Sequence, residues 1–167
     1  MDWLEKLELM AKHYKDDESG LAVPEPAFLF VVRQPKAISW PEGVPQTQEL
    51  ESYFKVFGGG VLGPQIVLHS LEEVREETDR WFNLLKDDEN FWGEVDEKNC
   101  VVIANDPDGA PWVYNTQTGQ IASYWWKESS WEEPICTSLA NFIEFVFAPH
   151  EGGDDWEKVK QQAGIKA

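Results

Sequence analysis

Apolar residues recur at helical spacing in four segments of this chain, which predicts helices at about 2–14, 47–57, 70–85 and 138–146. A shorter helix is expected at 156–162. Each long segment has apolar residues three and four positions apart, as on one buried helix face. The positions that define the four faces are Trp3, Leu7, Met10, Ala11 and Tyr14; Leu50, Tyr53, Phe54 and Phe57; Leu71, Val74, Trp81 and Leu85; and Leu139, Phe142, Ile143 and Val146.

Local signals mark where two of these helices begin and where one of them ends. Thr47 stands where an N-cap is expected, and Gly58-Gly59-Gly60 stops the helix that follows it. Ser70 and Glu73 have the spacing of a capping box, which places the start of the next helix at residue 70.

Short apolar or alternating runs predict strands at 27–32, 66–69, 100–104, 112–115 and 120–126, with a further short strand at 37–40. The last three runs are separated by turn clusters at 105–109 and 117–119, so they form an antiparallel meander. We therefore expect an α+β fold, with a central, mostly antiparallel sheet and helices packed on it. No repeat or low-complexity linker divides the chain, so residues 1–167 are expected to form one domain.

The net charge of the chain limits which classes of molecule it is expected to bind. The chain has 31 acidic and 14 basic residues, a net charge of −17. Such a field repels phosphate backbones and anionic membrane surfaces, so we expect no direct nucleic-acid or membrane binding. It would attract a basic protein, although acidity can also serve solubility alone. Residues 70–98 hold eleven acidic and four basic residues, a local balance of −7, and these acids fall mostly on one helix and the turn after it.

Two residue patterns resemble catalytic or metal-binding motifs, but the residues and elements around them do not fit those motifs. Glycines 58, 60 and 63 match GxGxxG, but they follow a helix and precede a strand, the reverse of a dinucleotide site. Asp106, Asp108 and Gly109 suit a hairpin turn better than a calcium loop, because Gln117 stands where the loop needs Glu. We expect no enzyme activity, cofactor or metal. A polar pocket of converging carboxylates around His69 would favour the alternative, an enzyme or small-ligand binder.

Neither cysteine, Cys100 or Cys136, has metal-site spacing, and nothing requires them to pair. The first residues contain early acids and no apolar core of a signal peptide, and no apolar run has the length of a membrane span. A cytoplasmic location is therefore expected.

The segment Tyr124–Glu133 joins three Trp with three Glu. On a strand, Trp125 and Trp126 point to opposite faces, so one of them is expected near the surface unless helices cover both faces. An exposed Trp beside Glu suits an anchor for a basic partner. Together with the acidic helix face, this gives the candidate partner-binding residues Glu72, Glu76, Asp79, Trp125, Trp126, Glu128, Trp131 and Glu132.

The serial order of three blocks resembles the SUKH superfamily of Smi/Knr-type domains. The first is the glycine-ended helix Leu50–Gly60, and the second is the strand and capped helix Ile66–Val74. The third runs from Val101 to Ile143 as strand, Asp-Gly turn, strand, Thr-Gly turn, strand and final helix. The resemblance covers about Val44 to Phe147. Residues 1–40 diverge from the family pattern, and 148–167 form an acidic tail.

The resemblance implies an α+β domain with a mixed or antiparallel sheet. Many bacterial SUKH members are immunity proteins that bind and neutralise toxins, often nucleases, delivered by competing cells; other members are regulatory or scaffold proteins. The expected function is therefore a non-enzymatic protein-binding module that neutralises a basic toxin domain. A cytosolic regulatory or scaffold adaptor of the same fold is the alternative.

Overall fold

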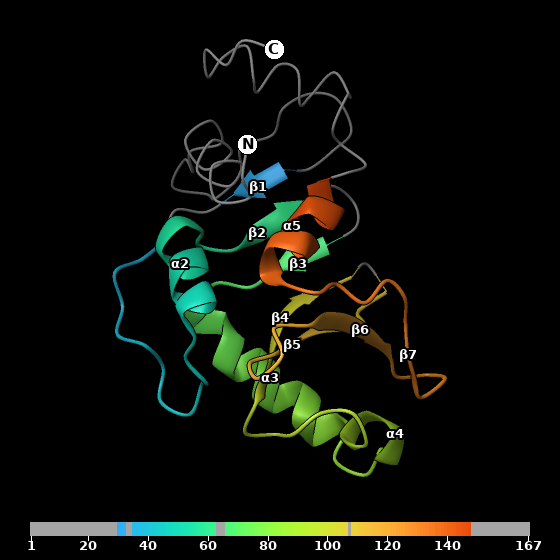
Figure 1. The fold of residues 1–167 in the computed structure, drawn as a ribbon. Helices are drawn as coiled ribbons and strands as arrows, with labels where there is room; N and C mark the ends of the chain where they lie inside the picture. Colours follow the sequence, from blue (N-terminus) through green and yellow to red (C-terminus); the bar gives the residue numbers. More distant parts are fainter. Residues whose placement is uncertain (1–29, 33–34, 63–65, 107, 148–167) are drawn as a thin grey trace.

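The computed structural model describes residues 30–32, 35–62, 66–106 and 108–147. Within these ranges seven strands form one sheet, and each strand pairs antiparallel with the next along the chain. Figure 1 shows the strands following one another from β1 to β7. The predicted α+β class and antiparallel sheet are confirmed. The strands are β1 (Phe30–Val32), β2 (Gly60–Leu62), β3 (Ile66–Leu68), β4 (Cys100–Asn105), β5 (Pro111–Asn115), β6 (Ile121–Trp125) and β7 (Ser130–Trp131).

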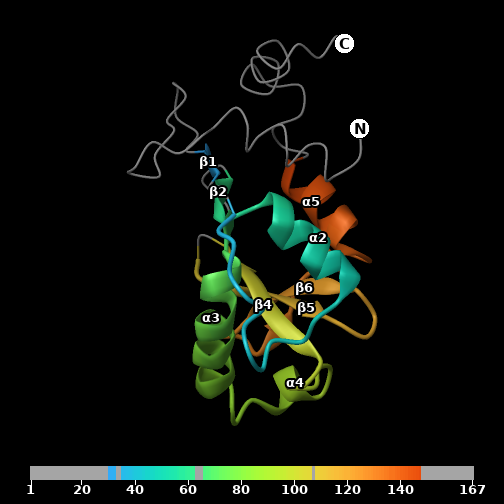
Figure 2. The same cartoon turned by 90° about the vertical axis from the view of Figure 1, so that its left-hand side faces the viewer.

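Helices cover both faces of the sheet, as Figure 2 shows. Those in the described ranges are α2 (Gln48–Val56), α3 (Leu71–Leu84), α4 (Glu89–Trp92) and α5 (Leu139–Phe147). Helices α2 and α5 share the larger apolar cluster with one face of the sheet. The end of α3 and helix α4 supply Trp81, Leu85 and Phe91 to a second cluster on the other face. The molecule therefore has three layers, with the sheet in the middle.

Strand β4 is buried on both of its faces. Val101 and Ile103 lie in the cluster under α2 and α5, whereas Cys100 and Val102 lie in the cluster under α3 and α4. A strand covered on both faces has no polar side to present, which explains why its sequence is an apolar run rather than an alternation.

A bulge interrupts β4 where helix α3 meets it. The pairing with β5 shifts between Val102 and Ala104, which leaves Ile103 as the extra residue. A bulge removes regular ladder partners from the backbone. The Ile103 carbonyl instead accepts a hydrogen bond from the His69 backbone N–H at 2.9 Å. The end of β3 is thereby fixed against β4, immediately before α3 begins.

Two side chains of α3 dock this helix on β4. The Thr78 hydroxyl accepts the buried backbone N–H of Val102, with Oγ1 3.0 Å from the nitrogen. One turn later the Trp81 indole Nε1 donates to Oδ1 of Asn105 at 3.1 Å. Buried backbone groups need hydrogen-bond partners. Thr78 therefore both satisfies the Val102 N–H of β4 and positions α3 on this strand.

The predicted helix starts are confirmed. The Thr47 hydroxyl accepts the Leu50 N–H at 3.1 Å and the Ser70 hydroxyl accepts the Glu73 N–H at 3.3 Å. Within the described residues, the strand predicted at 37–40 is wrong, because that segment carries no strand. There the Trp40 ring packs edge-on against Phe54, with centroids 6.0 Å apart, and its Nε1 donates to the Val44 carbonyl.

Three short elements were not predicted. Gly60 ends the glycine stop but also opens β2. The acidic turn expected after α3 is present at residue 87, and α4 begins directly after it at Glu89, with Asp88 as its N-cap. Strand β7 pairs only two residues with β6. The predicted helices at 2–14 and 156–162, and the part of the predicted first strand at 27–29, lie outside the described residues.

Replacing Gly59 with Ala is expected to destabilise the fold severely. Gly59 has φ +89°, and a Cβ there would stand 2.7 Å from the Ser70 nitrogen and 3.1 Å from the Leu68 oxygen. The backbone conformation alone costs a non-glycine residue about 1–3 kcal/mol. Gly109→Ala is the matched control, because Gly109 has φ +85° and open space around its Cβ position. Urea unfolding should show a much larger loss for Gly59→Ala, and equal losses would contradict the clash.

Thr78→Val should leave the buried Val102 N–H without its acceptor, at a cost of about 1–3 kcal/mol. Thr78→Ser keeps the hydroxyl and serves as the control. Amide hydrogen exchange of Val102 should accelerate in Thr78→Val beyond what the loss of global stability explains, and should stay slow in Thr78→Ser. Equal protection in both variants would show that Thr78 does not hold this strand.

Candidate functional site

The three acidic candidates on α3 share the outer face of this helix. Glu72, Glu76 and Asp79 are all exposed, four and three residues apart, so the structure brings them together. Two of the three have basic partners in the chain: Lys36 Nζ lies 3.5 Å from Glu72, and Arg75 Nε lies 3.7 Å from Asp79. Part of the negative charge on this face is thus already paired.

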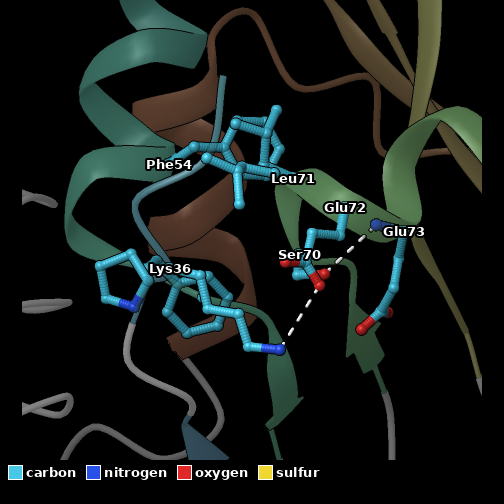
Figure 3. Close-up of a pocket in the computed structure, with 10 residues that line it drawn as sticks. Lys36, Phe54, Ser70, Leu71, Glu72 and Glu73 are labelled. Atoms are coloured by element: carbon cyan, nitrogen blue, oxygen red, sulfur yellow. Dashed lines mark hydrogen bonds and ion pairs between the residues drawn. The ribbon is translucent and has the colours of Figure 1, made fainter. Parts of the chain in front are cut away.

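A small cavity of about 110 Å³ lies beside the first turn of this helix. Figure 3 shows Phe54 and Leu71 lining it, with Lys36 directed at Glu72 across its mouth. The cavity is large enough for a few water molecules only.

The Trp-rich segment divides into inward and outward side chains. Trp131 packs inward: its ring stacks on Phe91 with centroids 5.2 Å apart and meets Tyr124 edge-on at 4.9 Å. Trp125 is half-buried at the end of β6, whereas Trp126 keeps 42% of its surface exposed. Glu128 and Glu132 are exposed as well. Of the three tryptophans, Trp126 is therefore the one best placed to meet a partner.

Trp126 lies on a groove of about 800 Å³ between the end of α3, helix α4 and the turn that joins β6 to β7. The same groove is lined by Leu84, which is 62% exposed. The buried Trp81 and Leu85 line its base. Its remaining lining residues are polar: Arg80, Asp87, Asp88, Glu89, Asn90 and Ser129. The groove thus combines two exposed apolar side chains with several carboxylates.

Asp88 ties the walls of the groove together. Its Oδ1 accepts the backbone N–H groups of Asn90 and Phe91 at 3.1 and 3.2 Å, which caps α4. Its Oδ2 accepts the Tyr124 hydroxyl at 2.8 Å, which joins α4 to β6. The Asn90 side chain donates to the carbonyl of Ser129, a residue with φ +51° in the β6–β7 turn. These bonds fix the position of the groove walls before any partner arrives.

The hydrogen bonds that Asp88 accepts also determine its pKa. Burial alone would raise the pKa of Asp88, but the hydrogen bonds from Tyr124, Phe91 and Asn90 lower it below its ordinary value. Asp88 is therefore charged at neutral pH while its oxygens are occupied within the chain. Asp87 and Glu89, on either side of it, are exposed carboxylates that line the same groove.

Sequence reasoning identified Trp126 but missed the other residues that line the groove, such as Leu84 and Asp88. Leu84 directly precedes the last residue of the buried stripe, and an apolar residue out of phase with that stripe is a signal for exposure. Asp88 precedes Asn90 and Phe91 with the spacing of an N-cap, which could have identified α4. Nothing in the sequence indicated that α4 would lie against the β6–β7 turn.

Carboxylates also converge on His69, the residue favoured by the enzyme alternative. The ring is only 3% exposed, with Nδ1 3.6 Å from Glu73 and Nε2 3.9 Å from Glu77. Burial works against the ionisation of Glu77, but the hydrogen bond from Arg80 and the charge of His69 lower its pKa. His69 therefore links the first two turns of α3 to β4, since its backbone N–H also donates to the Ile103 carbonyl.

Both cysteines are buried and unpaired, and burial raises the pKa of each thiol, that of Cys100 to about 12. Such thiols are poor nucleophiles at neutral pH. In the ranges that the structure describes, no three His, Cys, Asp or Glu side chains are grouped to hold a metal ion.

Comparison of the chain with protein-family models, with curated proteins and with solved structures gave no match. Within the described residues, no helix combines the length and apolarity needed to cross a bilayer. The function is therefore inferred from the side chains described above.

Tyr124→Phe should weaken the attachment of α4, and the loss should depend on pH. Burial, with the hydrogen bond to Asp88, raises the pKa of Tyr124 to about 12, against about 10 in an unfolded chain. The folded state holds this proton more tightly, so the stabilisation is complete below pH ~10 and declines as pH rises from about 10 to about 12.

At neutral pH the variant should lose about 1–3 kcal/mol, since a hydrogen bond to a charged group is removed. The difference between wild type and Tyr124→Phe should shrink above pH ~10. Urea unfolding followed by circular dichroism at several alkaline pH values measures it. The buried Tyr53 and the partly buried Tyr114 also have raised pKa values, but they are present in both proteins and cancel. A difference that does not change with pH would contradict the assignment.

Proposed function

We propose that this chain is a cytoplasmic, non-enzymatic protein-binding domain of the SUKH kind, and that it neutralises a basic toxin domain of a bacterial competition system. The observation that carries the proposal is the groove that Trp126 and Leu84 line together with exposed carboxylates. Exposed apolar side chains in a preformed, polar-edged groove are typical of a protein interface, where a few large side chains supply most of the affinity.

Charge supports a basic partner. The groove lies in the most acidic stretch of a chain whose net charge is −17. Proteins that act on nucleic acid bind phosphates with Lys and Arg, so a nuclease toxin would present a basic surface to this chain. The field would steer the encounter, and the apolar groove would hold the complex.

A binding role also fits the location of the ionisable groups. His69 and the two thiols are enclosed, and the carboxylates on the groove are either used as a helix cap, as Asp88 is, or open to solvent. A general acid or base needs a proton donor or acceptor that reaches a bound substrate, and the enclosed groups offer none.

A survival assay tests the proposal. The toxin encoded beside the gene for this chain is expressed in a susceptible bacterium with and without the chain, and an active-site variant of the toxin is the control for its toxicity. Survival is expected only when the chain is present. With purified proteins, the association rate constant should fall at least about tenfold from low to high salt, as steering predicts.

Equal killing with and without the chain would refute toxin neutralisation. If the gene has no toxin beside it and the chain is recovered in a defined cellular complex, the adaptor function is correct instead. The two outcomes separate the immunity role from the regulatory role of the same fold.

A further inference from the structure

Two cations of the chain lie over indole rings at the groove or beside it. The Lys127 ammonium stands 5.4 Å from the centre of the Trp126 ring and 5.5 Å from that of Trp125. The Arg80 guanidinium lies 4.9 Å from the centre of the Trp81 ring. A cation within about 6 Å of an indole is attracted by the negative face of the ring. Trp81 and Trp126, the two tryptophans that line the groove, thus each have a cation over the ring.

The two cations differ in how firmly they are held. Arg80 also forms an ion pair with Glu77, with Nη2 2.7 Å from Oε2, so it is fixed to α3. Lys127 is exposed in the β6–β7 turn, and among the described residues its ammonium has no ion-pair partner. A lysine side chain loses rotamer freedom when held, so a better-placed cation would displace it at little cost.

Carboxylates and apolar surface lie beside this position. Asp87 and Glu89 are exposed on the groove, and Leu84 offers an apolar contact in the same groove as Trp126. Asp88 is occupied by α4 and Tyr124, so a ligand would meet the other two acids.

We propose that the groove binds a partner segment that presents an Arg or Lys side chain next to an apolar one. The cation replaces Lys127 on the face of Trp126 and meets Asp87 and Glu89, while the apolar side chain covers Leu84. This deepens the proposed function, on which it rests for the identity of the partner as a protein. It places the anchor in the groove rather than on the outer face of α3.

A peptide titration tests this assignment. The probe is a blocked hexapeptide of alternating Arg and Leu, added to the full-length, isotope-labelled chain and followed by NMR. Shifts are expected at the Trp126 indole and at residues 84–89. A peptide with Ser in place of Leu should bind at least about tenfold more weakly, because it lacks the apolar contact. A peptide with Glu in place of Arg should not bind.

Four variants of the chain sharpen the result. Trp126→Ala should weaken the Arg-Leu peptide at least about tenfold, as for a central aromatic anchor. Lys127→Gln should tighten binding, because it removes the competing cation; a purely structural role would not produce this gain. Asp87→Asn with Glu89→Gln should weaken binding, whereas Glu76→Gln with Asp79→Asn removes the same charge from the outer face of α3 and should change it little.

Equal losses for the two charge pairs, with no effect of Trp126→Ala, would overturn the proposal, because the peptide would then sense only net charge. A dimer that Trp126→Ala dissociates would overturn it in favour of a second copy of the chain. Nuclear Overhauser contacts from the chain's own residues 1–29 or 148–167 to Trp126 would overturn it in favour of an internal occupant.

The survival assay keeps this inference apart from the proposed function. If Trp126→Ala protects cells as well as wild type does, the groove assignment fails and toxin neutralisation stands. If wild type does not protect, toxin neutralisation fails, and the peptide titration alone decides what the groove binds.

Discussion

The two-sided burial of β4 is the constraint on which the rest of the structure depends. A strand with apolar side chains on both faces needs a cover on each. Helices α2 and α5 contribute to one cluster and α4 to the other, while α3 contributes Val74 to the first and Trp81 to the second. The bulge at Ile103 adds a second requirement: it interrupts the β4–β5 pairing, so backbone groups of the buried strand need other hydrogen-bond partners. His69 and Thr78 meet that requirement from the neighbouring strand and helix, so the strand determines where α3 begins and which face it turns inward.

The position of the groove follows from this docking. Once Thr78 and Trp81 hold α3 on β4, Leu85 packs into the second cluster, and Leu84, which is out of phase with the buried stripe, is left exposed. The chain then returns through α4, which the Asp88–Tyr124 hydrogen bond fixes to β6. The β6–β7 turn closes the third side and carries Trp126 outward. The exposed apolar pair is thus a consequence of how the second layer is built.

The sequence predicted features that depend on neighbouring residues, but not those that depend on contacts between distant segments. Apolar spacing and caps predicted α2, α3 and α5 together with β3 to β6, because each depends on residues a few positions apart. Elements of two to four residues, such as β7 and α4, carry too little pattern of their own and form on contacts from distant parts of the chain. The tryptophans show the same limit. The expected strand alternation does not reach Trp126, because β6 ends at Trp125 and Trp126 lies in the turn after it. Only the fold shows that Trp131 packs on Phe91.

Net charge and anchoring surface are different properties of this molecule. The outer face of α3 has the larger group of acids, yet Lys36 and Arg75 neutralise part of it, and exposed ion pairs contribute little to affinity. The groove has fewer open carboxylates, but they adjoin an indole and a leucine that lose water on contact. Burial of apolar surface strengthens each neighbouring charge interaction because it excludes solvent. A long-range field and a small apolar site therefore need not coincide, and here the acids on the outer face of α3 and the groove at the end of this helix are different surfaces.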